Sequence, residues 1–389
     1  MLSLLPIELE EEVLSRVPVT CLRKLRSTCK KWNTLTKGES FCSLKRKQRK
    51  QGTATEVVMV LDCRVSLMSV HVGDLLNPTM ERIGNLRAAD GLKISNILHC
   101  EGFYLLCITT TQEKTELLLW NPPLGQARWI EPSKSHHEYE KYALGYGHDE
   151  EDTKVLRFVR VRQTTPRRPI IVTQNLCEFE VYSLKSNSWK VVDDIISPDW
   201  EIPHGHGCVS LKGNIYWYAH QEISVHYSGP IPKDNPDFLL SFDFKRERLG
   251  PRLPLPFNGC VIDTVTLSSV REEQLAVLFL TYDGAVGSVI KIWITNKIEP
   301  DQVSWGNLLL ACVIERVTRP PWMMQHPLSF FVDEDNKVAV VLDRIRGRSH
   351  FAYVIGDNGY LKTLDLGQAM DITSFQLLCP YLPSSLQIP

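Results

Sequence analysis

The side chains with the clearest potential for chemistry are His204, His206 and Cys208, which are separated by single glycines. Imidazole and thiolate groups bind zinc, but protein zinc sites usually take four ligands from separated pairs with rigid spacing. The sequence offers no second cluster of such ligands. A glycine-rich turn that enters a strand at Val209 explains the run better. We therefore predict that the protein holds no metal and no cofactor.

An acidic stretch from Asp333 to Asn336 faintly resembles a calcium-binding loop. It lacks the glycine and the distal glutamate that such a loop needs. The stretch lies between the apolar residues Phe331 and Val338, and short polar runs between apolar runs are typical of turns. The sequence therefore predicts a hairpin turn at this place.

Motifs of common enzymes are missing from the sequence. We find no G-x-S-x-G nucleophile elbow, no P-loop, no H-E-x-x-H pair and no dinucleotide fingerprint. Paired carboxylates cannot be judged without a fold, because any chain of this size has many. The sequence therefore favours a protein that binds over a protein that catalyses.

The composition is that of an ordinary globular protein. The chain has 389 residues, of which 43% are hydrophobic and 23% are charged. This length suits two domains and supplies enough apolar material for a sizeable core. The formal net charge of -1 argues against nucleic acid as a partner, because phosphate binding needs a clear basic excess.

The cysteines and the absence of leader-like segments bear on where the protein is found. Eleven cysteines include no C-x-x-C pair, and neither a secretory signal nor a stretch of about 20 apolar residues is visible. We therefore expect reduced thiols, no membrane association, and localisation in the nucleus and/or the cytoplasm. The basic run from Lys45 to Lys50 fits a solvated linker, and a nuclear localisation signal stays open.

The elements that must position any site differ in the two parts of the chain. The first fifty or so residues have helical spacing, with Pro6 in the first turn of one helix and Pro18 ending it. Its apolar stripe recurs every four residues: Leu5, Leu9, Val13 and Val17. A second helix is predicted with Thr20 as its N-cap. The apolar face assigned to it consists of Leu22, Leu25, Cys29 and Trp32.

After residue 55 the pattern changes to short strands. Runs of β-forming residues are bounded by Gly, Pro, Asn and Asp. A strand, a small polar turn and a second strand that often carries Trp recur about every fifty to sixty residues, the spacing of kelch-like propeller blades. The sequence therefore predicts an all-β, kelch-like β-propeller-type domain of about six blades. We expect Trp189 and Trp217 to be mostly buried between blades.

The N-terminal motifs resemble the F-box. The resemblance rests on the Leu5-Pro6 start, the Val17-Pro18 stop and the Cys29-Lys30-Lys31-Trp32 close, all at the expected spacing. Thr28 departs from the usual Val. The remainder resembles the F-box-associated domain of large plant families. The residues that carry this second resemblance are Asn121-Pro122, Tyr142 to Gly147, Val181 to Leu184 with Ser188-Trp189, and Gly213 to Trp217.

The resemblance implies a division of the chain into three parts. A small all-α F-box of three helices is expected at residues 1–48, and a basic linker at 49–55. An F-box-associated, β-propeller-like substrate-binding domain is expected at 56–389.

The resemblance also implies a function, that of a substrate receptor of an SCF (Skp–cullin–F-box) ubiquitin ligase. Its partners would be a Skp-family adaptor, a cullin reached through that adaptor, and an unknown protein substrate. Seven residues are expected at the adaptor interface: Leu5, Pro6, Leu14, Leu22, Leu25, Cys29 and Trp32. Alternatively, these residues only hold the three helices together.

Two other functions stay open on the sequence alone. The protein could bind a Skp-family adaptor without any role in ubiquitination, or it could be a propeller enzyme with a site at its central channel. In the receptor hypothesis, blade-top loops hold the target, because loops on a rigid scaffold carry recognition. The segments expected to form these loops are Glu131 to Tyr142, Arg162 to Asn175, His220 to Asp237 and Arg319 to Pro327.

Overall fold

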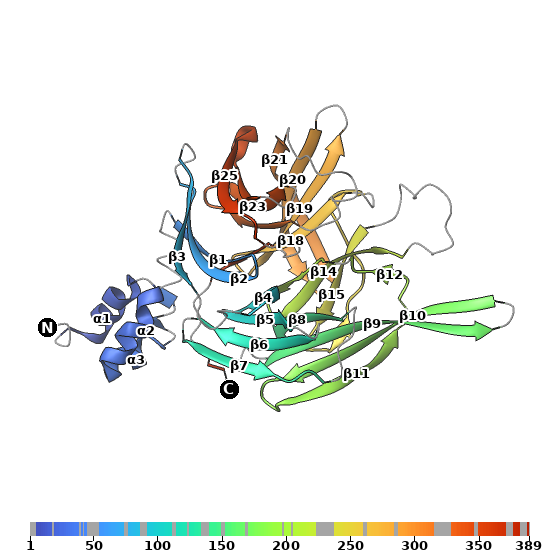
Figure 1. Cartoon of the computed structure of the whole chain (residues 1–389), viewed down its shortest axis with the longest axis horizontal. Coiled ribbons are helices and arrows are strands. Elements are labelled where there is room, and N and C mark those ends of the chain that lie inside the picture. The colour runs from blue at the N-terminus through green and yellow to red at the C-terminus, as the bar shows by residue number, and fades with distance from the viewer. Residues whose placement is uncertain are drawn as a thin grey trace. The chain divides into compact units, whose positions relative to one another are not determined.

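The computed structural model describes most of the chain. The described residues are 5–17, 19–38, 40–41, 43–44, 54–73, 77–85, 92–110, 114–122, 124–133, 140–148, 152–167, 170–196, 198–203, 205–222, 237–259, 263–283, 287–314, 328–345, 349–370, 376–381 and 387–388. They begin with helices and continue as strands (Figure 1). The chain divides into two compact units: Met1–Glu131 with Met370–Pro389, and Pro132–Ala369.

Three helices open the first unit: α1 (Ile7–Ser15), α2 (Val19–Thr28) and α3 (Lys30–Leu35). Pro6 is the N-cap of α1, one position before the first turn where we expected it. Its carbonyl accepts hydrogen bonds from the backbone N–H groups of Leu9 and Glu10, at 3.1 Å each. The backbone hydrogen-bond ladder of α1 therefore begins at the Pro6 carbonyl.

The second predicted helix is two helices in the structure. It begins at Val19, so the predicted N-cap at Thr20 is wrong, and it ends at Thr28. Cys29 has an extended backbone (φ -150°, ψ 129°) and is the N-cap of α3. Cys29 and Trp32 therefore do not continue the α2 face. A break of one residue hardly disturbs the three- and four-residue spacing of apolar side chains, so the sequence pattern did not show it.

Two antiparallel sheets complete the first unit. The first has the order β26 (Leu377–Pro380), β1 (Ala54–Leu61), β2 (Arg64–His71), β3 (Thr79–Asn85). The second has the order β4 (Ile94–Cys100), β5 (Phe103–Thr109), β6 (Thr115–Asn121), β7 (Gln126–Ile130).

Four antiparallel sheets form the second unit. The third sheet has the order β11 (Ser188–Ile196), β10 (Ile170–Ser183), β9 (Thr153–Arg167), β8 (Glu140–Tyr146). The fourth contains β12 (Trp200–Glu201), β13 (Cys208–Leu211), β14 (Asn214–Gln221), β15 (Asp237–Asp243), β16 (Arg248–Leu249) and β17 (Leu253–Pro254). The fifth runs β18 (Thr264–Val270), β19 (Gln274–Asp283), β20 (Gly287–Glu299), β21 (Gln302–Ile314). The sixth runs β22 (Ser329–Asp333), β23 (Val338–Ile345), β24 (Ser349–Ile355), β25 (Leu361–Gln368), with the short helix η4 (Asp357–Gly359) between the last two.

Within the described residues there are thus six sheets, which confirms the predicted propeller of about six blades. Within each unit, apolar faces pack between neighbouring sheets, as a propeller requires. Trp217, on β14, is 2% exposed in the core shared by the third and fourth sheets, as predicted. Trp189 is only partly buried, because it lies on β11, the last strand of its sheet, where its ring stands 5.3 Å from that of Tyr182.

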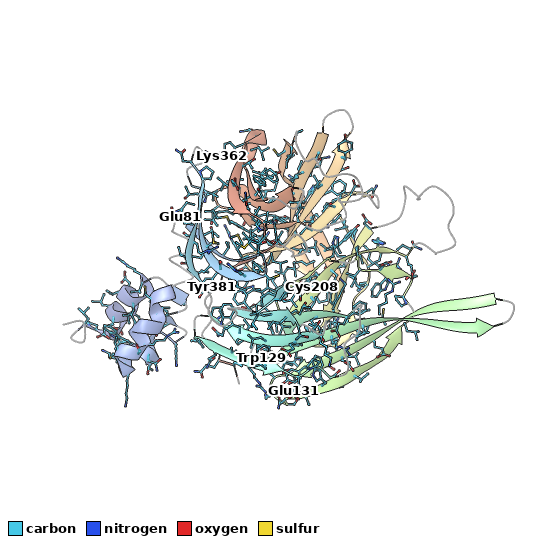
Figure 2. All side chains as sticks on the ribbon, in the orientation of Figure 1. Glu81, Trp129, Glu131, Cys208, Lys362 and Tyr381 are labelled. Atoms are coloured by element: carbon cyan, nitrogen blue, oxygen red, sulfur yellow. The ribbon has the colours of Figure 1, made fainter. Side chains whose placement is uncertain are left out.

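The first sheet joins the two ends of the β domain. Val57 pairs with Pro380 and Val60 with Leu377, so the last strand of the chain lies beside the first strand of the domain. Tyr381, labelled in Figure 2, is fully buried, and its N–H donates to the Glu56 carbonyl at 3.0 Å. A segment near residue 380 therefore completes a sheet that begins at residue 54.

The predicted loop from Arg162 to Asn175 is instead part of two long strands. Arg162 pairs with Asn175 and Arg167 with Ile170, so β9 and β10 continue as a two-stranded ribbon (Figure 1). The neighbouring strand β8 pairs only with residues 153–159 of β9, and β11 pairs only with residues 177–183 of β10. Of the other predicted loops, residues 134–139, 223–236 and 319–327 lie outside the described residues.

Candidate functional site

The three N-terminal helices pack around a small apolar core. Leu14, Leu22 and Phe41 are buried, and four half-buried side chains surround them: Val17, Leu25, Trp32 and Leu35. Burying an aliphatic or aromatic side chain of this size contributes about 1.5–3 kcal/mol. The helices therefore hold one another through a shared core.

Polar contacts fix the helices further. Lys31 Nζ lies 2.8 Å from Glu10 Oε1, and the Glu10 side chain is 1% exposed, which ties α3 to α1. Arg26 donates from Nε to Thr36 Oγ1 at 2.9 Å and from a terminal nitrogen to the Thr36 carbonyl at 2.8 Å. The ion pair thus connects α3 to α1, and the Arg26 bonds connect α2 to the end of α3.

The solvent side of this segment carries four apolar side chains. Leu5 is 37% exposed, Ile7 53%, Leu9 47% and Val13 44%. We call these four residues the apolar ridge. Leu9 and Val13 lie one turn apart on the same side of α1, whereas Leu5 precedes the helix and Ile7, two positions before Leu9, points to another side. Exposed apolar side chains gathered on one short segment are typical of partner surfaces on soluble proteins.

The structure separates the seven residues that we predicted at an adaptor interface. Leu5 and Pro6 are exposed and precede α1. Leu25, Cys29 and Trp32 are half-buried. Leu14 and Leu22 are 4% and 2% exposed in the helical core, so in the chain alone they have almost no surface to offer a partner. A role of Leu14 and Leu22 at an interface stays a prediction. In such a role they would act indirectly, by holding the helices in shape.

Sequence reasoning assigned only Leu5 of the apolar ridge to the interface. The four-residue recurrence of Leu5, Leu9 and Val13 was the signal that could have identified the other members. The recurrence alone does not distinguish these exposed residues from the buried Leu14. An apolar stripe about 100° wide includes residues that face the core and residues at its solvent-exposed edge.

The residues considered for metal binding have other contacts. His206 is 8% exposed, its ring lies 5.2 Å from that of Tyr218, and its carbonyl accepts from Lys141 Nζ at 3.1 Å. Cys208 Sγ donates to the Tyr142 carbonyl at 3.8 Å, and His204 lies outside the described residues. Among the residues that the structure describes, no group of three His, Cys, Asp or Glu side chains could hold a metal ion.

The acidic stretch after Phe331 is the predicted hairpin turn. It connects β22 to β23, and Asp333 Oδ1 accepts from the Asn336 N–H at 3.2 Å. Lys337 has a positive φ of 50°, as the tight return of the chain requires. The carboxylate therefore caps its own turn.

Lys141 connects the third and fourth sheets. Its Nζ donates to the carbonyls of Pro203 at 3.3 Å and His206 at 3.1 Å. Burial lowers the pKa of Lys141 to about 8, which nearby Cys208 and Glu201 only partly offset. The amine therefore anchors the segment that leads into β13.

None of the described helices is long and apolar enough to cross a membrane.

The described residues thus define a two-part architecture, a helical segment with an apolar ridge followed by six antiparallel sheets. Comparison with family models identifies both parts. Residues 2–44 match the F-box domain, and residues 56–388 match the F-box associated beta propeller domain. The chain therefore belongs to the F-box proteins that carry an F-box-associated β-propeller.

Individual relatives agree with this family. The F-box/kelch-repeat protein At3g16740 of Arabidopsis thaliana is 45% identical, over 100% of this chain and 99% of the relative. The F-box protein At3g17320 of the same plant is 40% identical, with the same coverage. A solved six-bladed β-propeller lectin from Aleuria aurantia is 10% identical with a TM-score of 0.40, over 80% of this chain and 90% of the lectin. So distant a likeness says nothing about activity.

Proposed function

We propose that this protein is the substrate-recognition subunit of an SCF ubiquitin ligase. The N-terminal helices bind a Skp-family adaptor, the adaptor connects the chain to a cullin, and the β-propeller holds a target protein. We place this activity in the nucleus and/or the cytoplasm. Membership of the F-box family supports the general role.

The apolar ridge is the single observation that carries the proposal. Four apolar side chains, each at least 37% exposed, lie on a segment that matches the F-box. Removing about half of one such side chain from water is worth roughly 1 kcal/mol, so the four together supply several kcal/mol of binding free energy. A complex with micromolar affinity requires about 8 kcal/mol in total, which leaves a substantial share for polar contacts.

In this role the chain needs no catalytic residue. A receptor accelerates transfer to a bound target by holding it near a reactive partner, which converts a bimolecular encounter into a local one. This accords with the absence of the enzyme motifs from the sequence.

Co-purification of the full chain with a Skp-family adaptor tests the proposal. We expect Leu9→Asp and Val13→Asp to reduce recovery of the adaptor by at least tenfold, because each places an unpaired carboxylate in the interface. Val191→Asp is the matched control, since Val191 is 50% exposed on β11, close to the 44% of Val13. Undiminished recovery with both ridge variants would refute the assignment of the ridge.

A second measurement separates a ligase receptor from a protein that binds the adaptor and does nothing more. The full chain should recover a cullin together with the adaptor, and its deletion should stabilise at least one specific protein. Recovery of adaptor and cullin with no stabilised protein would favour the second function.

A further inference from the structure

A pocket of about 230 Å³ lies between two turns of the second unit. One wall is the hairpin that connects β15 to β16, and the other is the two-residue turn, Pro300–Asp301, between β20 and β21. Its charged lining residues are Asp243, Arg246, Arg248 and Asp301. The pocket thus joins an outer edge of the fourth sheet to a turn of the fifth.

The floor of the pocket is fixed by close packing. Ser241 Oγ donates to the Pro300 carbonyl at 2.5 Å, and the Gly250 N–H donates to the Ser241 carbonyl at 3.0 Å. A Cβ on Gly250 would lie 2.2 Å from the Pro300 oxygen, which is too close for any other residue. Glycine at this position therefore allows the Pro300–Asp301 turn to approach, and the two walls hold a set distance.

Asp243 and Arg246, one charge of each sign, contact each other and the backbone within the hairpin. Asp243 Oδ1 accepts from the backbone N–H groups of Lys245 at 2.8 Å and Arg246 at 3.1 Å. Its other oxygen, Oδ2, lies 3.7 Å from Arg246 Nε. Asp243 and Arg246 therefore stabilise the turn that carries them.

Arg248 and Asp301, the other two charged residues of the lining, do not take part in the hairpin contacts. The side chains of Arg248 and Asp301 are exposed and line the same pocket. Within the described part of the chain, neither makes an ion pair or a side-chain hydrogen bond, and their charged atoms are not within 4.0 Å of each other. One pocket thus presents a free cation and a free anion with space between them.

We propose that this pocket binds a small dipolar molecule, with an anionic group against Arg248 and a cationic amine against Asp301. The four charged side chains of the lining sum to zero, so the pocket gives no net attraction to a simple anion or a simple cation. Its volume equals the share of seven or eight water molecules at ~30 Å³ each, which suits a short amino acid. This ligand site is independent of the function proposed above.

The affinity should be modest, because both side chains are exposed and water screens their charges. We expect a dissociation constant on the order of a millimolar. The length of the ligand should matter, since only one separation of the two charges matches the distance between Arg248 and Asp301. Selectivity for charge separation is therefore the signature of the site.

Isothermal titration of the full chain with ω-amino acids tests the proposal. The series is glycine, β-alanine, 4-aminobutyrate and 6-aminohexanoate, with butyrate and butylamine as ligands that carry one charge. We expect one member of the series to bind saturably, at least tenfold more tightly than either single-charge ligand. Saturation by no member, or equal binding of butyrate or butylamine, would overturn the proposal.

Charge reversal gives a sharper result. Arg248→Glu alone and Asp301→Lys alone should each reduce binding at least tenfold. The double variant should restore it, because a dipolar ligand can bind in the opposite direction. Lys245→Glu is the matched control, since Lys245 is exposed in the same hairpin but does not line the pocket. A folded double variant without binding would refute the proposal, as would single variants that bind the ligand as tightly as the native chain.

Discussion

The indole Nε1 of Trp305 donates a hydrogen bond to the carbonyl oxygen of Pro254 at 2.8 Å. Trp305 lies on β21 and Pro254 ends β17, so this bond connects the outer strands of the fourth and fifth sheets. The ladder between β20 and β21 shifts register on both sides of the Thr295–Trp305 pair. Such irregularities redirect side chains, and here one turns the indole towards the neighbouring blade.

Replacing Trp305 by Phe should therefore weaken the contact between these two sheets. The variant keeps most of the apolar surface but loses the donor, and we expect the free energy of unfolding to fall by about 0.5–1.5 kcal/mol. Urea denaturation measures this change. Trp129→Phe is the control, because Trp129 also lies on an outer strand, β7, and donates no side-chain hydrogen bond within the described residues. An unchanged midpoint for Trp305→Phe would show that the bond contributes nothing to stability.

Replacing Trp217 by Ala should destabilise the propeller strongly. Its side chain is 2% exposed among Phe242 and other core residues of the third and fourth sheets, and truncation of such a residue costs about 3–5 kcal/mol. Trp129 is 53% exposed, so Trp129→Ala should change stability by less than about 1 kcal/mol. Thermal melting of both variants checks the contrast, and similar melting temperatures would contradict it.

The adjacent residues Val13 and Leu14 should respond in opposite ways to the same substitution. Leu14→Asp buries a carboxylate in the helical core and should unfold the N-terminal helices, at a cost of several kcal/mol. Val13→Asp adds the charge on the solvent side, where the side chain is 44% exposed, and should leave the helices folded. Hydrogen exchange of the α1 amides distinguishes the two. Protected amides in Leu14→Asp would contradict the core assignment.

Asp237 should make the propeller more stable as the solution becomes mildly acidic. Burial, only partly offset by a hydrogen bond from Tyr218, raises the pKa of Asp237 to about 6, and Oδ2 has no hydrogen-bond partner. In the unfolded chain an aspartate titrates near 3.9. Between about pH 6 and pH 4 the folded state therefore binds more protons, so its stability rises as the pH falls.

Asp237→Asn removes this titration. At pH 7 the variant should be more stable than the native chain by about 1–2 kcal/mol, and the advantage should shrink as the pH falls from about 6 to about 4. Urea midpoints measured across this pH range provide the test. Asp357→Asn, at a side chain that is 49% exposed, is the control. A variant less stable than the native chain at pH 7 would show that the carboxylate is needed there.

Glu247 should have the reverse pH dependence. Burial alone would raise its pKa, but hydrogen bonds from Lys190 and Lys154, at 2.9 Å and 3.0 Å, outweigh burial and lower it. The stabilisation by this carboxylate is therefore present above the unfolded pKa of about 4.3 and is lost as the pH falls through the folded value.

Glu247→Gln should abolish that contribution and make the unfolding midpoint less sensitive to salt. The expected loss is below about 1 kcal/mol, because Lys190 is exposed and water screens the pair. Denaturation at low and high ionic strength measures it. Equal salt sensitivity of the variant and the native chain would contradict an electrostatic role.

Local patterns were sufficient to predict most strands. The apolar runs Val338 to Leu342 and Phe351 to Ile355 became β23 and β24, because a short run of β-branched and aromatic residues between turn residues has few other ways to bury itself. The Asp333 turn was predictable for the same reason, since its polar residues bond to their own backbone.

Features that depend on strand pairing or on contacts between helices were not predictable. Arg162 to Asn175 reads as a loop because its sequence has no regular alternation of apolar and polar residues, although its two halves pair with each other. In α1, Leu14 lies in the core whereas Leu9 and Val13 are exposed. Which residues are buried depends on where α2 and α3 pack, and the helical spacing of apolar residues does not contain that information.

The pairing of β26 with β1 has a consequence for biosynthesis. The end of β1 at Leu61 and the start of β26 at Leu377 are 377 − 61 = 316 positions apart. At about 5–20 residues per second, a ribosome needs roughly 15–60 s to make the intervening chain. During that time one edge of β1 has no partner strand, whereas α1, α2 and α3 make local contacts and can fold at once. The nascent polypeptide thus carries a finished helical module on a β domain whose first sheet is completed among the last.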